Sequence, residues 1–477
     1  MKIQKNTNLL PKTPTGISGL DEITNGGFPK GRPTLICGSA GCGKTLFGIQ
    51  FLVKGAVEFN EPGVFLSFEE SPSDLSENVK SLGFDLEVLK AEKKLRIDHV
   101  HIERSEIEET GDYDLEGLFI RLNHAIDAIG AKRVVLDTIE SLFSGMTNLA
   151  VLRSEIRRLF HWLKEKGVTA IITGERGEKS LTRQGLEEYV SDCVILLDFR
   201  VIDQLATRRL RIVKYRGSTH GTNEYPFLID ETGVSVIPVT SLKLDYKSPN
   251  EIISTGLPGL DKLFEAGGLF RASSTLITGT AGTSKTILAG YFALSSCMRK
   301  ERVLYFSFEE SPDQLQRNML SIGIDLKLHI KSKLLYIHAS RPSLQGLEMH
   351  LLVLHKLLDE FKPRTIIVDP ISSLITIGST SEVRGMLIRL IDLLKINQVN
   401  AWFTALTHEN SNMYNDATVD AVSSLADTWI NVRNEEKNND RTRSLLIVKA
   451  RGMGHANKRQ DFKITNNGIL FKRGQKK

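Results

Sequence analysis

The sequence predicts two tandem α/β domains, each built on a mainly parallel, twisted sheet flanked by helices. Two observations predict this fold class. A long segment of the chain recurs about 240 residues later, and within each copy short apolar strands alternate with amphipathic helices. A length of 477 residues accommodates two such domains. We therefore expect domains at residues 1–245 and 246–477, joined by the polar stretch 240–251, which contains Pro249.

The repeat has four clear parts. They are residues 16–45 recurring as 256–286, 64–75 as 304–315, 133–142 as 364–374, and 213–217 as 448–452. A period this long is far beyond the unit of a solenoid, so it indicates a duplicated domain.

Within each copy the strands are short and rich in β-branched residues. The strands expected in the first copy are TLICG, GVFLSF, KLRIDHV, RVVLD, VTAIIT and VILLD, and the second copy repeats the series. Between the strands, apolar residues fall on one helical face. In the first copy these are Leu115, Leu118, Phe119, Leu122 and Ile126, and in the second Leu344, Leu347, Leu351, Leu354 and Leu358.

Composition excludes several classes of protein. With 41% hydrophobic and 25% charged residues, the chain is neither disordered nor fibrous. It contains no apolar run of ~18 residues that would span a membrane, and its first residues do not resemble a signal peptide. The four cysteines lack metal-ligand spacing, so we expect a cytoplasmic protein without disulfides or structural zinc. A net charge of +5 gives no general indication of nucleic-acid binding.

The first copy contains a complete GxxxxGK[ST] motif between an apolar strand and a helix. Its residues are Gly38, Ser39, Ala40, Gly41, Cys42, Gly43, Lys44 and Thr45. Backbone N–H groups of such a loop surround phosphates, the lysine reaches the β- and γ-phosphates, and the threonine ligates Mg²⁺. A chance glycine turn is the alternative, and the strand–loop–helix context argues against it. We expect ATP and Mg²⁺ as ligands.

The second copy retains the motif with one change. It reads Gly279, Thr280, Ala281, Gly282, Thr283, Ser284, Lys285 and Thr286. Ser284 replaces the last glycine and must adopt a backbone conformation that glycine adopts more easily. We expect ATP binding here too, with a degenerate, non-binding loop as the alternative.

Carboxylates follow the predicted strands in both copies. Asp137 and Asp369 end the apolar strands VVLD and IIVD, where P-loop ATPases place the carboxylate that assists Mg²⁺. A turn or helix cap is the alternative for one such aspartate, but its recurrence favours the metal role.

Two glutamate pairs follow another strand, Glu69 with Glu70 and Glu309 with Glu310. A carboxylate near a γ-phosphate can act as general base. The Ser-Pro that follows each pair is typical of a helix start, so the acids could instead merely precede a helix.

Basic pairs occur near the end of each copy, Lys214 with Arg216 and Lys449 with Arg451. Spaced by two on a strand, both side chains leave the same face. They either form a solvated strand edge or point at the nucleotide of a neighbouring subunit.

Together these features resemble the KaiC family, the double-domain ATPases and autokinases of the circadian clock, within the RecA/DnaB superfamily of P-loop proteins. The resemblance covers nearly the whole chain. Besides the P-loops it includes two FEES-P elements, GLEEYVSD at 185–192 and KYRGSTHGTNEYPF at 214–227.

The resemblance implies two tandem RecA-like domains, a homohexamer of two stacked rings and ATP between subunits. It implies hydrolysis supported by Glu69 and Glu70, and transfer supported by Glu309 and Glu310 to hydroxyls of the adjacent subunit. By alignment these hydroxyls are Ser423 and Ser424, the second a serine where the family commonly has threonine. The first copy has Glu188 and Tyr189 there. From residues alone, two serines before a strand indicate only a polar turn.

The resemblance also bears on partners. It implies a KaiB-like protein on the first ring, near residues 111–124. Family members continue into a C-terminal tail that KaiA engages, whereas this chain ends at Lys477, so we do not expect KaiA-type regulation.

Two other classes of function stay open. A RecA- or DnaB-type DNA motor would share the fold, but the expected basic, aromatic-interleaved loop is not evident. A nucleotide-switched scaffold without phosphotransfer is favoured by Ser284.

Overall fold

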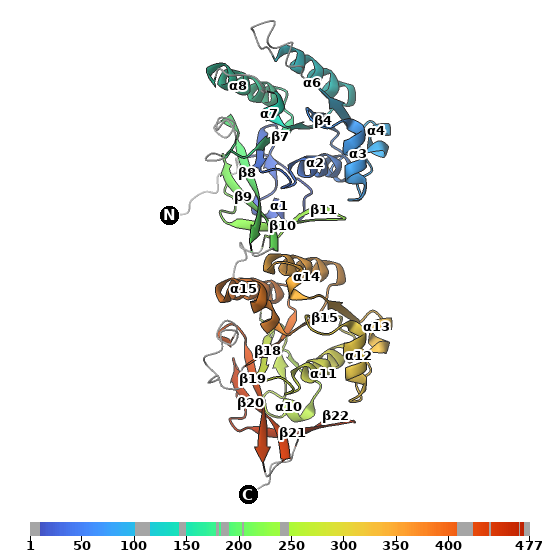
Figure 1. Cartoon of the computed structure of the whole chain (residues 1–477), viewed down its shortest axis with the longest axis vertical. Coiled ribbons are helices and arrows are strands. Elements are labelled where there is room, and N and C mark those ends of the chain that lie inside the picture. Colours follow the sequence, from blue (N-terminus) through green and yellow to red (C-terminus); the bar gives the residue numbers. More distant parts are fainter. Residues whose placement is uncertain are drawn as a thin grey trace. The chain divides into compact units, whose positions relative to one another are not determined.

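The structure is a computed structural model, shown in Figure 1. It describes residues 10–100, 115–142, 149–177, 181–182, 190–202, 205–238, 248–407, 423–437, 440–466 and 468–471. The chain divides into two compact units, Met1–Ser241 and Leu242–Lys477. Residues 240–247 of the predicted joining stretch lie outside the described residues. The helices in the described ranges are all too short or too polar to cross a membrane.

The first unit is built on a nine-stranded sheet, in the order β11-β10-β9-β8-β3-β7-β6-β4-β5. Its strands are β3 (Pro33–Gly38), β4 (Gly63–Ser67), β5 (Leu95–His99), β6 (Arg133–Asp137), β7 (Thr169–Glu175), β8 (Cys193–Ile202), β9 (Leu205–Tyr215), β10 (Glu224–Asp230) and β11 (Gly233–Val236). A small ladder pairs β1 (Lys12–Thr13) with β2 (Phe28–Pro29). The helices are α1 (Leu20–Ile23), α2 (Lys44–Glu58), α3 (Pro72–Lys80), α4 (Leu86–Ala91), α6 (Glu116–Ile129), α7 (Ile139–Leu142) and α8 (Leu149–Glu165).

Both faces of this sheet are covered, because alternate strand residues enter different cores. Val135 of β6 packs in a core with Phe47 and Phe51 of α2. Its neighbour Val134 packs in the opposite core, with Leu122 of α6. Burial on both faces is what makes the strands apolar throughout rather than alternating.

The second unit repeats the arrangement, with strand order β16-β15-β17-β18-β14-β19-β20-β21-β22. The strands are β14 (Ser274–Gly279), β15 (Val303–Ser307), β16 (Leu335–Ala339), β17 (Thr365–Asp369), β18 (Asn400–Leu406), β19 (Thr428–Lys437), β20 (Asp440–Ala450), β21 (Gln460–Thr465) and β22 (Gly468–Phe471), besides a ladder of β12 (Ile252–Ile253) and β13 (Leu269–Phe270). The helices are α10 (Pro258–Asp261), α11 (Lys285–Met298), α12 (Pro312–Leu320), α13 (Lys327–Lys331), α14 (Leu347–Phe361) and α15 (Thr380–Ile396), with 3₁₀ turns at Pro342–Leu344 and Ile371–Ile377.

The prediction of two mainly parallel α/β domains is confirmed, with one addition in each. Across the first sheet, the neighbouring strands β5, β4, β6, β7, β3 and β8 pair in parallel, whereas β8, β9, β10 and β11 pair antiparallel. In the second sheet β19 pairs parallel with β14, and β19 to β22 form the matching antiparallel extension. The sequence analysis did not identify this extension as antiparallel.

The predicted helical face of the second copy is wrong at one residue. Leu347, Leu351, Leu354 and Leu358 are buried on α14, but Leu344 lies in the preceding 3₁₀ turn and is 70% exposed. The helix begins only at Leu347, because Gly346 before it has an extended backbone.

Candidate functional site

The first P-loop joins β3 to α2, as the strand–loop–helix context predicts. The side chain of Lys44 is buried and folds back over the loop, where Nζ donates to the carbonyl oxygens of Gly38 at 2.9 Å and Ser39 at 3.0 Å. Gly41 and Gly43 have φ of 73° and 101°, in the left-handed region. The loop therefore curls around a lysine ammonium at the start of a 15-residue helix, the arrangement that favours a bound anion.

The second P-loop adopts the same geometry despite Ser284. Lys285 Nζ donates to the carbonyl oxygens of Gly279 and Thr280, each at 2.8 Å. Ser284 has φ 80° and ψ 28°, close to the 101° and 20° of Gly43. Burial lowers the pKa of Lys285 to about 8, although nearby Asp369 and Glu309 oppose the shift.

Asp137 and Asp369 lie beside these loops. Asp137 is buried, and its Oδ2 accepts a hydrogen bond from Thr45 Oγ1 at 2.7 Å while Oδ1 accepts one from Thr173. Burial raises the pKa of Asp137, and the two threonine hydrogen bonds oppose that shift. The structure thus joins the predicted hydroxyl and carboxylate of the first site.

The second aspartate has a different partner. Asp369 Oδ1 accepts from Thr404, the counterpart of Thr173, but Oδ2 accepts from the hydroxyl of Tyr305 at 2.6 Å. Sequence reasoning missed both threonines and the tyrosine. The threonines carried a detectable signal, since they recur at nearly the same offset as the aspartates.

The two glutamates of each pair face different neighbours. Glu69 Oε1 accepts from Thr138 at 2.9 Å and Ser141 at 2.5 Å, both just after β6, and Glu309 Oε1 accepts from Ser373 at 3.0 Å, just after β17. The first glutamate of each pair is therefore held beside the segment that follows the aspartate.

The second glutamate of each pair turns toward the next helix. Glu70 accepts from Asn78 Nδ2 at 3.2 Å, and Glu310 accepts from Asn318 Nδ2 at 3.3 Å. Burial raises the pKa of Glu310, Asn318 opposes the shift, and Asp369 and Glu309 add to it. Ser71 and Ser311 cap α3 and α12, so each Ser-Pro begins a helix, as the sequence indicated.

Ser423, Ser424 and the second basic pair lie together at the other edge of the sheet. Lys449 Nζ donates to the carbonyl oxygen of Ser423 and Arg451 Nη2 to that of Ser424, both at 2.5 Å. Ser424 is exposed. Arg451 is also 3.8 Å from Asp427, as Arg216 is 3.9 Å from Asp192 in the first domain.

The register places this edge far from the P-loop of the same domain. Strands β14 and β19 run parallel with Thr275 opposite Thr428, so the serines precede β19 at the edge where β14 begins. The P-loop follows β14 at its other end, after Gly279. At ~3.3 Å per residue, six residues separate these edges by roughly 17 Å. Lys214, opposite Val194, is placed in the same way in the first domain.

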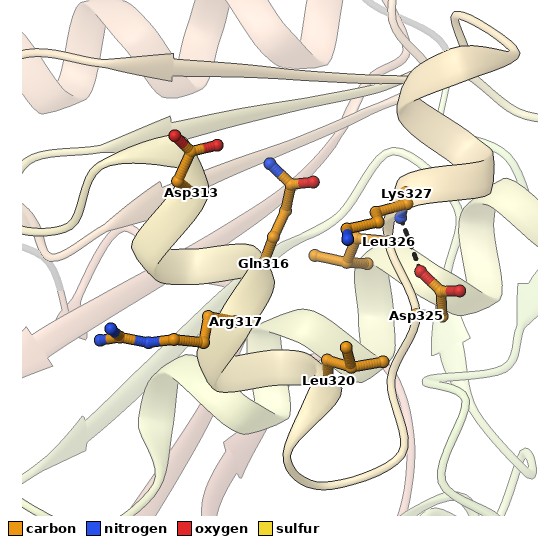
Figure 2. Close-up of a pocket in the computed structure, with 7 residues that line it drawn as sticks. All are labelled: Asp313, Gln316, Arg317, Leu320, Asp325, Leu326 and Lys327. Carbon is orange, nitrogen blue, oxygen red and sulfur yellow. Dashed lines mark hydrogen bonds between the residues drawn. The ribbon is translucent and has the colours of Figure 1, made fainter.

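A surface pocket of about 250 Å³ lies between α12 and α13 (Figure 2). It is lined by Asp313, Gln316, Arg317, Leu320, Asp325, Leu326 and Lys327. None of its lining residues was predicted as a site residue, and we assign it no role. Glu188, Tyr189 and residues 111–114 of the expected KaiB-like contact lie outside the described residues; residues 116–124 belong to α6.

Two duplicated α/β domains, each with a P-loop, an aspartate and a glutamate gathered at one edge of its sheet, define a tandem P-loop nucleotide-binding protein. Comparison with protein families is more specific. The model described as "ATPase: KaiC" matches residues 13–241 and again 253–476. The chain belongs to the KaiC family of double-domain ATPases.

Curated relatives match over nearly the whole chain. It is 56% identical to the circadian clock protein KaiC2 of Synechocystis sp. over 96% of this chain and 81% of that protein. It is 37% identical to the circadian clock oscillator protein KaiC of Synechococcus elongatus, over 96% of this chain and 88% of the relative. The KaiC of Prochlorococcus marinus is likewise 37% identical, over 97% and 92%.

Proposed function

We propose that this protein binds Mg-ATP in both domains, hydrolyses it mainly in the first, and in the second transfers phosphate to Ser423 and Ser424 of a neighbouring subunit within a homohexamer. The observation that carries the proposal is the duplicated cluster of P-loop lysine, threonine, aspartate and glutamate. A serine pair accompanies this cluster in the second copy, where the sequence of the first has Glu188 and Tyr189.

The donor sets fit the proposed ligands. Buried Lys44 and Lys285 each lie against two loop carbonyls at the start of a long helix, where a phosphate would replace the carbonyls as their partner. Thr45 and Asp137 present the hydroxyl and carboxylate oxygens that Mg²⁺ prefers, and Thr286 and Asp369 are their counterparts. Held by these residues, Mg²⁺ would supply positive charge that offsets the negative charge of the phosphates during transfer.

The glutamates have separate roles in this proposal. Glu69 and Glu309 act as general bases, because they are the carboxylates held beside the segments that follow Asp137 and Asp369. Glu70 and Glu310 instead anchor the strand end to α3 and α12 through their asparagine partners.

The chemistry is a displacement at the γ-phosphorus. In the second domain a serine Oγ forms the new P–O bond, the bond from phosphorus to the β,γ-bridging oxygen breaks, and ADP leaves. Glu309 accepts the serine proton. In the first domain water replaces the serine and Glu69 accepts its proton, so the products are ADP and phosphate.

The sheet geometry supports transfer between subunits. Ser423 and Ser424 lie roughly 17 Å along the strands from the P-loop of their own domain, and this distance supports a donor phosphate from another chain. The basic residues Lys449 and Arg451 lie beside these serines, since they donate to the carbonyl oxygens of Ser423 and Ser424, and Lys214 and Arg216 are their counterparts in the first domain. Placed at that far edge, they stabilise phosphate charge on a neighbour's nucleotide.

The family supports the biological setting. Relatives named as circadian clock proteins lead us to propose a clock-like or signalling hexamer, with a KaiB-like partner on the first ring. Cytoplasmic location follows the same analogy.

Intact-mass spectrometry after incubation with Mg-ATP tests the proposal. We expect species heavier by about 80 Da, one phosphoryl group per hydroxyl. The matched control, Ser423→Ala/Ser424→Ala, should lose them while keeping ATPase activity. If the native chain hydrolysed ATP but gained no mass, the proposed phosphotransfer would be wrong and a nucleotide-switched scaffold would be favoured.

A further inference from the structure

One buried aromatic position differs between the two domains, and in the second domain its side chain contacts the aspartate. Phe65 on β4 lies opposite Val135, two residues before Asp137, and Tyr305 on β15 lies opposite Ile367, two residues before Asp369. Both aromatic side chains are fully buried. The copies are thus structurally matched here, and the difference is a single hydroxyl group.

Within the described part of the chain, that hydroxyl has one hydrogen-bond partner. Tyr305 donates to Asp369 Oδ2 at 2.6 Å, whereas in the first domain the matching oxygen accepts from the P-loop residue Thr45. The other aspartate oxygen accepts from a threonine in both copies.

The two aspartates are therefore oriented by different means. Asp137 is held by Thr173 of the sheet and by Thr45, a residue of the P-loop. Asp369 is fixed from inside the sheet by Tyr305 and Thr404. Among the residues the structure describes, no hydrogen bond joins Thr286 to Asp369. In the described structure both oxygens of the second carboxylate are thus held by residues other than its P-loop threonine.

We propose that Tyr305 is a positioning residue of the second site, holding Asp369 in the orientation that receives hydrated Mg²⁺. The inference rests on the proposed Mg-ATP binding. Groups that hydrogen-bond a metal-facing carboxylate orient it, and their loss typically weakens metal binding by ~10–100-fold. Tyr305 does not touch substrate, so its loss acts through the metal rather than on the transferred phosphate.

The test measures magnesium-dependent binding of a fluorescent ATP analogue to the full chain carrying Lys44→Ala, which silences the first site. Tyr305→Phe in this background should raise the Mg²⁺ concentration for half-maximal binding about tenfold. The substitution introduces the residue that the first domain already has at this position, so the sheet accommodates it. Autophosphorylation of the Tyr305→Phe variant should recover at saturating Mg²⁺, because the substitution changes the magnesium requirement and not the maximal rate.

Tyr291→Phe is the matched control. It also removes a hydroxyl in the second domain, one that bonds the backbone N–H of Ile469 at 3.2 Å, and should leave the Mg²⁺ requirement unchanged. If the Lys44→Ala parent shows no magnesium-dependent binding, both the proposed function and this inference are wrong. If the parent binds and Tyr305→Phe shifts no further than Tyr291→Phe, the role of Tyr305 alone is overturned.

Discussion

Ser284 carries a backbone conformation that the first P-loop assigns to glycine. A side chain in the left-handed region costs about 1–2 kcal/mol, partly offset because serine loses less backbone entropy than glycine on folding, by ~0.5–1 kcal/mol. We therefore expect Ser284→Gly to stabilise the second domain by about 0.5–1 kcal/mol. Calorimetry of the chain should show the transition of that domain at higher temperature.

The first domain provides the reverse change as a control. Gly43→Ser should destabilise it by more than Ser284→Gly stabilises the second, because a Cβ at Gly43 would lie 2.8 Å from Ile229 Cδ1 in addition to the backbone cost. An unchanged or lowered transition for Ser284→Gly would show that the loop is relaxed around serine.

The two glutamates of the first domain have different hydrogen-bond partners, so we predict different effects when each is replaced. Glu69→Gln should lower ATPase activity by ~10²–10⁴-fold while leaving ATP binding intact, since the general base is lost and the P-loop is not. Glu70→Gln should retain most activity, because its carboxylate is engaged by Asn78. Steady-state phosphate release measures both.

Equal losses from the two substitutions would contradict the assignment. If Glu309→Gln abolished turnover and Glu69→Gln left it intact, the roles of the two domains would be reversed.

At the scale of the elements, the helix that follows each glutamate pair depends on its cap. Ser311 Oγ accepts from the backbone N–H of Gln314 at 3.2 Å, and Pro312 occupies the first helical position of α12. Ser311→Ala should therefore destabilise the second domain by ~1 kcal/mol, and Ser311→Asp should restore most of it. Urea unfolding followed by circular dichroism measures the change. Equal stability of the alanine and aspartate variants would exclude a capping role.

The elements that carry motifs could be predicted from the sequence, because each depends on residues close together along the chain. The P-loops, the strands ending at Asp137 and Asp369, and the caps at Ser71 and Ser311 depend on residue types at short spacing. The antiparallel strands β9 to β11 depend on pairing across the sheet, which periodicity does not report. Leu344 matched the helical period and yet lies outside α14, because the backbone of Gly346 sets the start.

The candidate site shows the same division. Lys44, Thr45 and Asp137 were predicted from motif and repeat, and the structure brings Thr45 and Asp137 into contact. The contact of Tyr305 with Asp369 could not be predicted, because it depends on the pairing of β15 with β17 and on the register that puts Tyr305 opposite Ile367. The separate orientations of Glu69 and Glu70 also required the helix that follows them.

At the scale of the whole molecule, the far edge of each sheet explains why this chain should assemble. Under the proposed function, the basic pairs at this edge contact the nucleotide of the next subunit, and ATP lies between the two. A ligand held between subunits stabilises the assembled state by mass action. We expect a hexamer in the presence of ATP and dissociation without it, measured by multi-angle light scattering. A monomer at saturating ATP would contradict subunit-interface binding.

The same geometry gives a sharper prediction for phosphotransfer. A Glu309→Gln/Glu310→Gln chain keeps its acceptor serines but lacks the base, and a Ser423→Ala/Ser424→Ala chain keeps the base but lacks acceptors. Neither should be labelled alone from radioactive ATP. Because the serines lie roughly 17 Å from the P-loop of their own domain, mixed hexamers should label the first chain and not the second. Full-rate labelling of the glutamine chain alone would mean that neither glutamate is the base. Mixed hexamers that are never labelled would contradict transfer between subunits, and labelling that maps to other serines would remove Ser423 and Ser424 as acceptors.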